Sequence, residues 1–173
     1  MDMREMEDGT SGRKDASPLC ITINGDYEEY YVAPSMRLVD FLRDYLGMTG
    51  TKISCEIGRC GACSVLVDEV LMNACLLNVY QVAGKSIQTI EGMKGEKALH
   101  PIQESFLKDG GFQCGYCTPG MVMAVQALLA EYPEPTEVQI REGLSGNLCR
   151  CTGYGGIIRA VKRAARELRQ VKI

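Results

Sequence analysis

Eight of the nine cysteines fall into two groups, and this grouping constrains the fold of the 173-residue chain more than any other feature. The first group is spaced C-x4-C-x2-C-x11-C, and the second is spaced C-x2-C, then a long insert, then C-x-C. Their members are Cys55, Cys60, Cys63 and Cys75, followed by Cys114, Cys117, Cys149 and Cys151. Most of the remaining sequence is therefore expected to be a scaffold for two four-cysteine sites.

The spacing of the first group favours an iron–sulfur cluster over a zinc ion. Three of its cysteines lie on one short loop and the fourth follows at a distance, as in plant-type [2Fe-2S] sites. Structural zinc sites usually combine two short cysteine pairs instead. Gly58 and Gly61 fit the same interpretation, because a loop around a negatively charged cluster needs positive φ angles and nearby backbone N–H groups.

The second group is ambiguous when its spacing is considered alone. A C-x2-C pair combined with a C-x-C pair is compatible with a four-cysteine zinc site as well as with an iron–sulfur cluster. Cys20 belongs to neither group, and we expect it to be a small buried residue of a strand.

The charge balance, together with the lack of a recognisable secretory signal or membrane-spanning run, indicates a reducing environment. The formal net charge is only −3, so the chain offers no general attraction to nucleic acid. The first residues mix acids and bases and lack the apolar core of a secretory signal. The longest apolar run, near 121–130, is too short to cross a bilayer. We therefore expect a cytoplasmic protein, in which clustered cysteines bind metal rather than form disulfides.

Hydrophobic periodicity changes from strand-like to helix-like near the middle of the chain. In the first half, Asn24-Gly25 separates two β-branched and aromatic runs, which predicts a β-hairpin. A helix is expected from Ser35 to Gly47, with Leu38, Phe41, Leu42 and Tyr45 on its buried side. Further elements are expected as a strand pair over 64–72 that turns at Asp68-Glu69, a short helix over 76–82 and a strand over 86–90.

The second half is predicted to be helical. His100-Pro101 and Thr118-Pro119 are each typical of a helix start, Thr136 is a candidate N-cap, and a last helix follows Gly155-Gly156. The stripe expected to be buried in the second of these helices is Met121, Val125, Leu128, Leu129 and Tyr132. The fold class expected is α+β, with a disordered tail over 1–17, one domain over 18–91, a linker over 92–98 and an all-α domain over 99–173.

No motif for substrate chemistry accompanies the cysteines. The sequence lacks a recognisable nucleophile–base pair, a paired-carboxylate site, and a Walker or dinucleotide-binding glycine motif. His100 is the only histidine, and we expect it to cap a helix or lie at the surface rather than bind metal. The residues alone thus indicate a carrier of electrons that transforms no substrate itself.

The two motifs together closely resemble the small iron–sulfur subunit of the xanthine dehydrogenase, or molybdenum hydroxylase, family. The resemblance extends from about Leu19 to Arg169 and rests on Cys55–Cys75, Gln113-Cys-Gly-Tyr-Cys-Thr-Pro-Gly and Gly146-Asn-Leu-Cys-Arg-Cys-Thr-Gly-Tyr. It implies a ferredoxin-like β-grasp domain with one [2Fe-2S] cluster, followed by a four-helix domain with a second. Ser54 and Asp68-Glu69 depart from the usual family residues, but neither departure changes a cysteine.

The resemblance also implies a place in a larger complex. The second cysteine group would hold the cluster nearest a molybdopterin cofactor in a large subunit, and the first group would hold the cluster that faces FAD in a medium subunit. Gln113 and Cys151 match positions that approach the pterin. Xanthine or hypoxanthine is the expected substrate of the complex, with carbon monoxide, nicotinate and aldehyde dehydrogenases as relatives. A free-standing ferredoxin and a zinc-containing interaction module remain the alternatives of another class.

Overall fold

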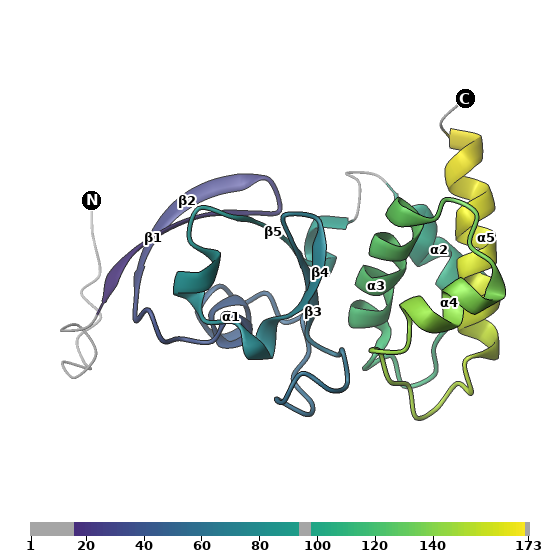
Figure 1. The fold of residues 1–173 in the computed structure, drawn as a ribbon, viewed down its shortest axis with the longest axis horizontal. Coiled ribbons are helices and arrows are strands. Elements are labelled where there is room, and N and C mark those ends of the chain that lie inside the picture. The colour runs from purple at the N-terminus through teal and green to yellow at the C-terminus, as the bar shows by residue number, and fades with distance from the viewer. Residues whose placement is uncertain (1–15, 94–97, 172–173) are drawn as a thin grey trace.

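The computed structural model describes residues 16–93 and 98–171. Its described part contains a five-stranded sheet followed in the chain by helices, so the α+β prediction is confirmed (Figure 1). The remaining positions of the expected tail and linker, 1–15 and 94–97, lie outside the described residues. The first strand begins at Ser17, so this residue of the expected tail belongs to the sheet.

The sheet is mixed and has the strand order β2-β1-β5-β3-β4. β1 pairs in antiparallel fashion with β2 and in parallel fashion with β5, and β3 is antiparallel to both of its neighbours. The strands are β1 (Ser17–Ile23), β2 (Asp26–Val32), β3 (Ser64–Val67), β4 (Val70–Asn73) and β5 (Ser86–Gln88). The hairpin expected at Asn24-Gly25 is present, with φ of 53° and 98° at the two turn residues.

The helix expected from Ser35 begins later than predicted. α1 (Leu38–Asp40) continues into a π-helical segment, η2 (Phe41–Tyr45), and the N-cap position belongs to Arg37. The preceding backbone is used in pairing instead, because Arg37 forms a bridge with Asn78. Leu38, Phe41 and Leu42 are fully buried as expected, whereas Tyr45 is 52% exposed.

Short 3₁₀ segments and four α-helices complete the described chain. The short segments are η3 (Ala74–Leu76), η4 (Val79–Val82) and η5 (Ile90–Met93). The first two stand where one short helix over 76–82 was expected, and η5 covers the end of the strand expected over 86–90 and the first two residues of the expected linker. The α-helices are α2 (Pro101–Lys108), α3 (Thr118–Glu131), α4 (Glu137–Gly143) and α5 (Gly155–Val171). His100 caps α2 by accepting a hydrogen bond from the Ile102 amide, and Thr136 caps α4, both as predicted. Cys117, not Thr118, is the N-cap of α3.

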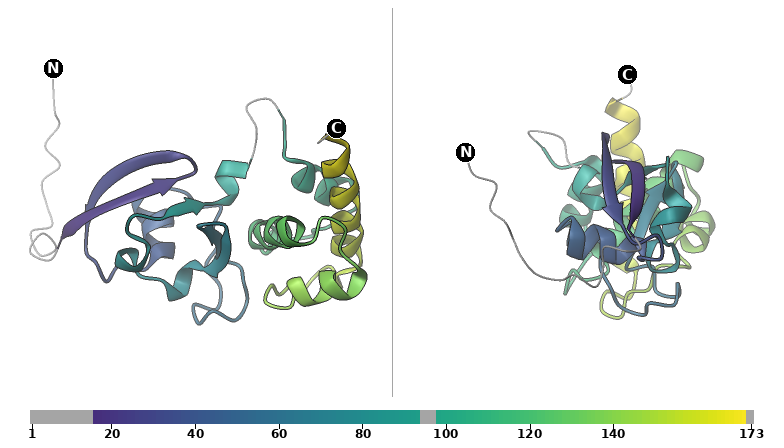
Figure 2. Two further views of the ribbon diagram at one scale, coloured as in Figure 1. Left: turned by 45° about the horizontal axis from the view of Figure 1, so that its top comes forward. Right: turned by 90° about the vertical axis from the view of Figure 1, so that its left-hand side faces the viewer.

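Strand β3 is shared by two hydrophobic cores. Its side chains alternate between the faces of the sheet. Val65 and Val67 pack in the core between the sheet and α1, whereas Leu66 packs in the core of the helices. All four residues of β3 are therefore buried, and α3 packs directly against β3 and β4. The sheet part and the helical part lie side by side in the left view of Figure 2, and the packing of α3 against β3 places this strand between them.

Two tyrosines expected to be buried are exposed at the ends of their helices. Met121, Val125, Leu128 and Leu129 of the predicted stripe lie in the core, but Tyr132 at the C-terminal end of α3 is 38% exposed.

In the described chain, no helix is both long and apolar enough to cross a membrane.

Candidate functional site

The first cysteine loop lies between η2 and β3 and is built from tight turns. Backbone N–H groups of Arg59 and Cys60 both donate to Cys55 Sγ, each at 3.3 Å. The pKa of Cys55 is lowered to about 7, chiefly by the backbone N–H of Ile57 and further by the neighbouring Cys60 thiol and amide groups. The loop therefore favours the thiolate form, which is the form that binds metal.

Gly58 and Gly61 have the positive φ angles expected for this loop, at 71° and 67°. A Cβ at Gly58 would lie only 2.2 Å from Leu76 Cδ1, and a Cβ at Gly61 would lie 2.5 Å from the Gly146 carbonyl oxygen. Both positions thus need glycine for backbone conformation and for close packing.

The other two cysteines of the first group are buried and lie together. Cys63 directly precedes β3, Cys75 lies in η3, and the Ala74 amide donates to the Cys63 carbonyl oxygen at 3.1 Å. Burial raises the pKa of Cys63 to about 12, and the adjacent Cys75 thiol contributes to the rise. The first group therefore contains two thiol pairs, Cys55 with Cys60 and Cys63 with Cys75.

The second group also forms two pairs, from the loops that precede α3 and α5. Cys151 Sγ lies 3.7 Å from Cys114 Sγ, and both residues are exposed. Cys117 and Cys149 form the inner pair. The pKa of Cys117 is raised to about 12, first by burial and then by the Cys149 thiol. Burial opposes ionisation of Cys149, but hydrogen bonds from Thr152 outweigh it and lower the pKa of this thiol.

The pairwise arrangement fits a two-iron cluster. Two thiolates bound to one tetrahedral metal at about 2.3 Å are separated by roughly 3.7 Å, and this is the distance between Cys114 Sγ and Cys151 Sγ. A [2Fe-2S] cluster has two irons that share four thiolates, so it requires two such pairs. Among the described residues, no set of three or more His, Cys, Asp or Glu side chains is placed to hold a single metal ion.

Direct hydrogen bonds join the two cysteine loops. The Leu148 amide donates to the Cys60 carbonyl oxygen at 2.9 Å. The side-chain amide of Asn147, which is 4% exposed, donates to the Gly61 carbonyl oxygen at 3.0 Å and to Ser64 Oγ at 3.3 Å. The loops before β3, α3 and α5 lie along the same edge of the molecule in Figure 1. The loop that carries Cys60 is thus in contact with the residue before Cys149.

Sequence reasoning missed several polar residues that support the cysteines. Tyr154 Oη accepts a hydrogen bond from the Cys149 amide at 2.9 Å, and Thr152 Oγ1 donates to Cys149 Sγ at 3.1 Å. Asn147 likewise lies within the second motif but was not among the predicted site residues. Their only signal was their place within two or three residues of a cysteine, because their partners become neighbours only after folding.

Two other residues singled out from the sequence, one as a pterin contact and one as a buried cysteine, lie apart from these contacts. Gln113 lies in the exposed segment immediately before Cys114. Cys20 was expected to be buried but is half-exposed on β1, where its side chain lies beside Tyr27 of the adjacent strand.

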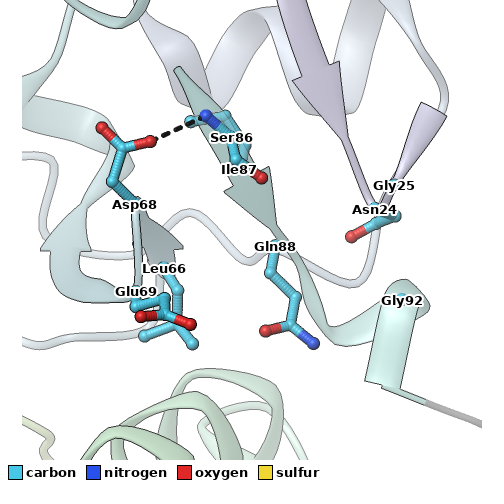
Figure 3. Close-up of a pocket in the computed structure, with 9 residues that line it drawn as sticks. All are labelled: Asn24, Gly25, Leu66, Asp68, Glu69, Ser86, Ile87, Gln88 and Gly92. Carbon is cyan, nitrogen blue, oxygen red and sulfur yellow. Dashed lines mark hydrogen bonds between the residues drawn. The ribbon is translucent and has the colours of Figure 1, made fainter. Parts of the chain in front are cut away.

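A cavity of about 360 Å³ lies away from the cysteines, at the end of the sheet near the β3–β4 turn. Figure 3 shows its lining, in which an Asp68 carboxylate oxygen accepts a hydrogen bond from the Ser86 amide at 2.9 Å. Asn24 lies on the side of the cavity opposite Asp68, and Gln88 lies between them. This cavity holds no cysteine and has no part in the metal centres.

Comparison with known families agrees with the two-site architecture. Residues 21–79 match the model of a 2Fe-2S iron–sulfur cluster binding domain, and residues 89–162 match that of a [2Fe-2S] binding domain. The fold and these matches define a protein with two [2Fe-2S]-binding domains.

Known relatives identify the family more closely. The chain is 55% identical to one subunit of a probable xanthine dehydrogenase from Bacillus subtilis, over 86% of this chain and 85% of the relative. It is 41% identical to one subunit of the nicotinate dehydrogenase from Pseudomonas putida, over 88% of this chain and 97% of that subunit. It also superimposes on a chain of quinoline 2-oxidoreductase from Pseudomonas putida with a TM-score of 0.87 and 42% identity. The superposition covers 92% of this chain and 100% of that chain. The chain belongs to the iron–sulfur subunits of the molybdenum hydroxylase family.

Family membership establishes the coarse chemistry. The protein is an iron–sulfur component of an oxidoreductase, it has two [2Fe-2S]-binding domains, and the partner subunits of this family carry molybdopterin and FAD.

Proposed function

We propose that this chain transfers electrons from a molybdopterin centre in a large subunit, through two [2Fe-2S] clusters, to FAD in a medium subunit. Cys55, Cys60, Cys63 and Cys75 hold the cluster next to the flavin subunit. Cys114, Cys117, Cys149 and Cys151 hold the cluster next to the molybdopterin subunit. When bound, each cluster supplies a one-electron carrier.

The observation that carries this proposal is the direct contact between the two cysteine loops. The Leu148 N–H to Cys60 carbonyl hydrogen bond connects the backbone beside a ligand of one site to the backbone of a ligand in the other. Two independent structural metal sites would not require this contact, whereas a relay benefits from a short and rigid connection. Asn147 is buried between the same two loops and fixes their separation.

The proposed domain roles are compatible with the positions of the cysteine pairs. We assign residues 18–91 to a β-grasp ferredoxin-like domain and residues 99–173 to a four-helix cluster-binding domain, joined by 92–98. The exposed Cys114 and Cys151 lie at the surface that would face the large subunit. We propose that Gln113, which is exposed beside Cys114, contacts the pterin, because a side-chain amide both donates and accepts hydrogen bonds. We place the complex in the cytoplasm.

Xanthine or hypoxanthine is the substrate we propose for the complex, with urate as the final product of purine oxidation. This assignment is supported by the 55% identity to the Bacillus protein. The second candidate is the oxidation of an N-heteroaromatic acid, because the relative from nicotinate dehydrogenase matches at 41% over nearly its full length.

Metal analysis and spectroscopy test the electron-transfer role. The anaerobically purified complex should contain about four iron and four acid-labile sulfide per copy of this chain, corresponding to two clusters. Reduction with dithionite should give two distinct EPR signals. About two iron together with one zinc would support the zinc-containing interaction module instead.

Size and substrate specificity complete the test. Size-exclusion chromatography of native extract should place this chain with two larger subunits, and a stand-alone ferredoxin would elute near 19.0 kDa. The substrate is then identified by which of xanthine, nicotinate or an aldehyde reduces the clusters, as shown by the appearance of their EPR signals.

A further inference from the structure

We propose that the Thr152 hydroxyl raises the reduction potential of the second cluster through its hydrogen bond to Cys149 Sγ. This inference rests on the proposed binding of a cluster by the second cysteine group. It assigns Thr152 as a positioning and tuning residue that is not itself a ligand.

The hydroxyl is aimed at the sulfur by a second hydrogen bond. Thr152 Oγ1 accepts from the Tyr154 backbone N–H at 3.2 Å and lies 3.1 Å from Cys149 Sγ. Because the Tyr154 amide occupies one lone pair of the oxygen, the hydroxyl proton is free to point at the thiolate. The Thr152 amide also donates to the same sulfur, at 3.4 Å.

The surrounding loop holds this geometry in place. Gly153 and Tyr154 have positive φ angles of 61° and 65°, which turn the Tyr154 amide back toward Thr152. The Tyr154 side chain closes the loop, because its oxygen accepts from the Cys149 amide at 2.9 Å and donates to the Asn147 carbonyl oxygen at 3.4 Å. Thr152 itself is half-buried, so water competes weakly for its hydroxyl.

A side-chain donor distinguishes Cys149 from the first cysteine loop. Over the part of the chain that the structure describes, the hydrogen bonds to Cys55 come from backbone N–H groups and from the thiol of Cys60, which is itself one of the four cysteines of that site. A backbone donor is present whatever the side chain, whereas the Thr152 hydroxyl depends on one residue. The potential of the second cluster is therefore adjustable by substitution at position 152.

The physical effect follows from charge. One-electron reduction adds a negative charge that spreads onto the thiolates, and no proton needs to move because the hydroxyl remains protonated. A hydrogen bond to a more negative acceptor is stronger. The Thr152 hydroxyl therefore stabilises the reduced state more than the oxidised state, and hydrogen bonds to cluster sulfur are a recognised determinant of the potential.

Redox titration of the intact complex, monitored by EPR, tests this proposal. Thr152→Val removes the hydroxyl while keeping the branched shape, and Thr152→Ser keeps the hydroxyl. In Thr152→Val we expect the ratio of reduced to oxidised second cluster, at a fixed ambient potential, to fall on the order of tenfold. For a one-electron couple this corresponds to a shift of about 59 mV to more negative potential. Thr152→Ser should remain near the wild type.

The first cluster provides an internal control, because its signal is titrated in the same sample and should not shift. An unchanged potential of the second cluster in Thr152→Val would overturn the proposal. If this variant failed to assemble the cluster, Thr152→Ala would remove the hydroxyl without placing a methyl group beside the sulfur, and the same criterion would apply. Loss of the second cluster in both variants, but not in Thr152→Ser, would assign the hydroxyl to assembly and overturn the claim about potential.

The test also separates this inference from the proposed function. A wild-type complex with one cluster per chain would contradict the proposed function itself. If the wild-type complex contains two clusters, but substitution of Thr152 leaves the reduction potential of the second cluster unchanged, only the role of Thr152 is contradicted.

Discussion

Replacing Gly120 with alanine should separate the two cysteine loops. Gly120 lies in the first turn of α3, and a Cβ built on it would lie 2.1 Å from the Gly61 carbonyl oxygen. Real Cβ atoms essentially never approach within 3.0 Å, so the backbones must move apart by at least 0.9 Å, the difference between these two distances. Gly61 is held in the same place by Asn147, and its neighbour Cys60 is held by Leu148.

The energetic cost can be estimated from two opposing effects. Forcing an extra methyl group into a packed site costs about 1–3 kcal/mol, whereas alanine gains up to about 1 kcal/mol over glycine in a helix. The clash involves backbone atoms on both sides and has little room to relax. We therefore expect Gly120→Ala to destabilise the protein by about 1–2 kcal/mol, which lowers the melting temperature by roughly 2–8 °C for a chain of this size.

Gly155→Ala is the matched control for this prediction. Gly155 also lies at the start of a helix, but a Cβ there would have only the Arg159 guanidinium within 4 Å, at 3.7 Å. This variant should melt at or above the wild-type temperature in a circular dichroism experiment. Freeze-quench EPR should show slower electron transfer between the clusters in Gly120→Ala and unchanged transfer in Gly155→Ala. Wild-type stability and wild-type transfer in Gly120→Ala would refute the reasoning.

Three further predictions concern the relay and its scaffold. Cys60→Ser should remove the first cluster and block flavin reduction, while substrate still reduces the molybdenum, as followed by EPR. Slow reduction of the molybdenum by substrate in this variant would count against the proposed order of the cofactors. Leu148→Pro removes the N–H that donates to the Cys60 carbonyl oxygen and should slow inter-cluster transfer with both clusters retained, whereas Leu148→Ala should not; equal rates would exclude this connection. Arg163 donates to both carboxylate oxygens of Asp109, at 2.6 and 3.0 Å, and these hydrogen bonds lower the pKa of Asp109. The pair therefore stabilises the fold above the unfolded-state pKa of about 3.9, and this stability is lost as the pH falls through the lower folded-state pKa. The melting temperatures of wild type and Asp109→Asn should thus differ at pH 7 and converge in acid; a constant difference would be inconsistent with this role.

Local sequence signals predicted those elements that depend on neighbouring residues. The Asn24-Gly25 turn, the caps at His100 and Thr136 and the positive φ angles of Gly58 and Gly61 all follow from backbone conformation or from partners a few residues away. The two groups of cysteines were also predictable from short-range spacing, because most members of each group lie on short loops.

Features that depend on packing between distant segments were not predictable in this way. The helix expected at Ser35 starts later because the chain before Leu38 pairs with Asn78, which is remote in sequence. The burial of every residue of β3 follows from α3 covering the second face of the sheet. The contact of Leu148 with Cys60 could not be read from either motif alone, since it appears only when the two domains pack together.

The most direct test of the account is an anaerobic reductive titration of the purified complex, with the EPR signals integrated against the amount of this chain. The account predicts two separate iron–sulfur signals, each accepting about one electron per chain, and each lost selectively when its own cysteines are replaced by serine. A single signal, or a second signal that survives replacement of Cys114 and Cys149, would contradict the claim that two separate groups of thiolates form one electron relay.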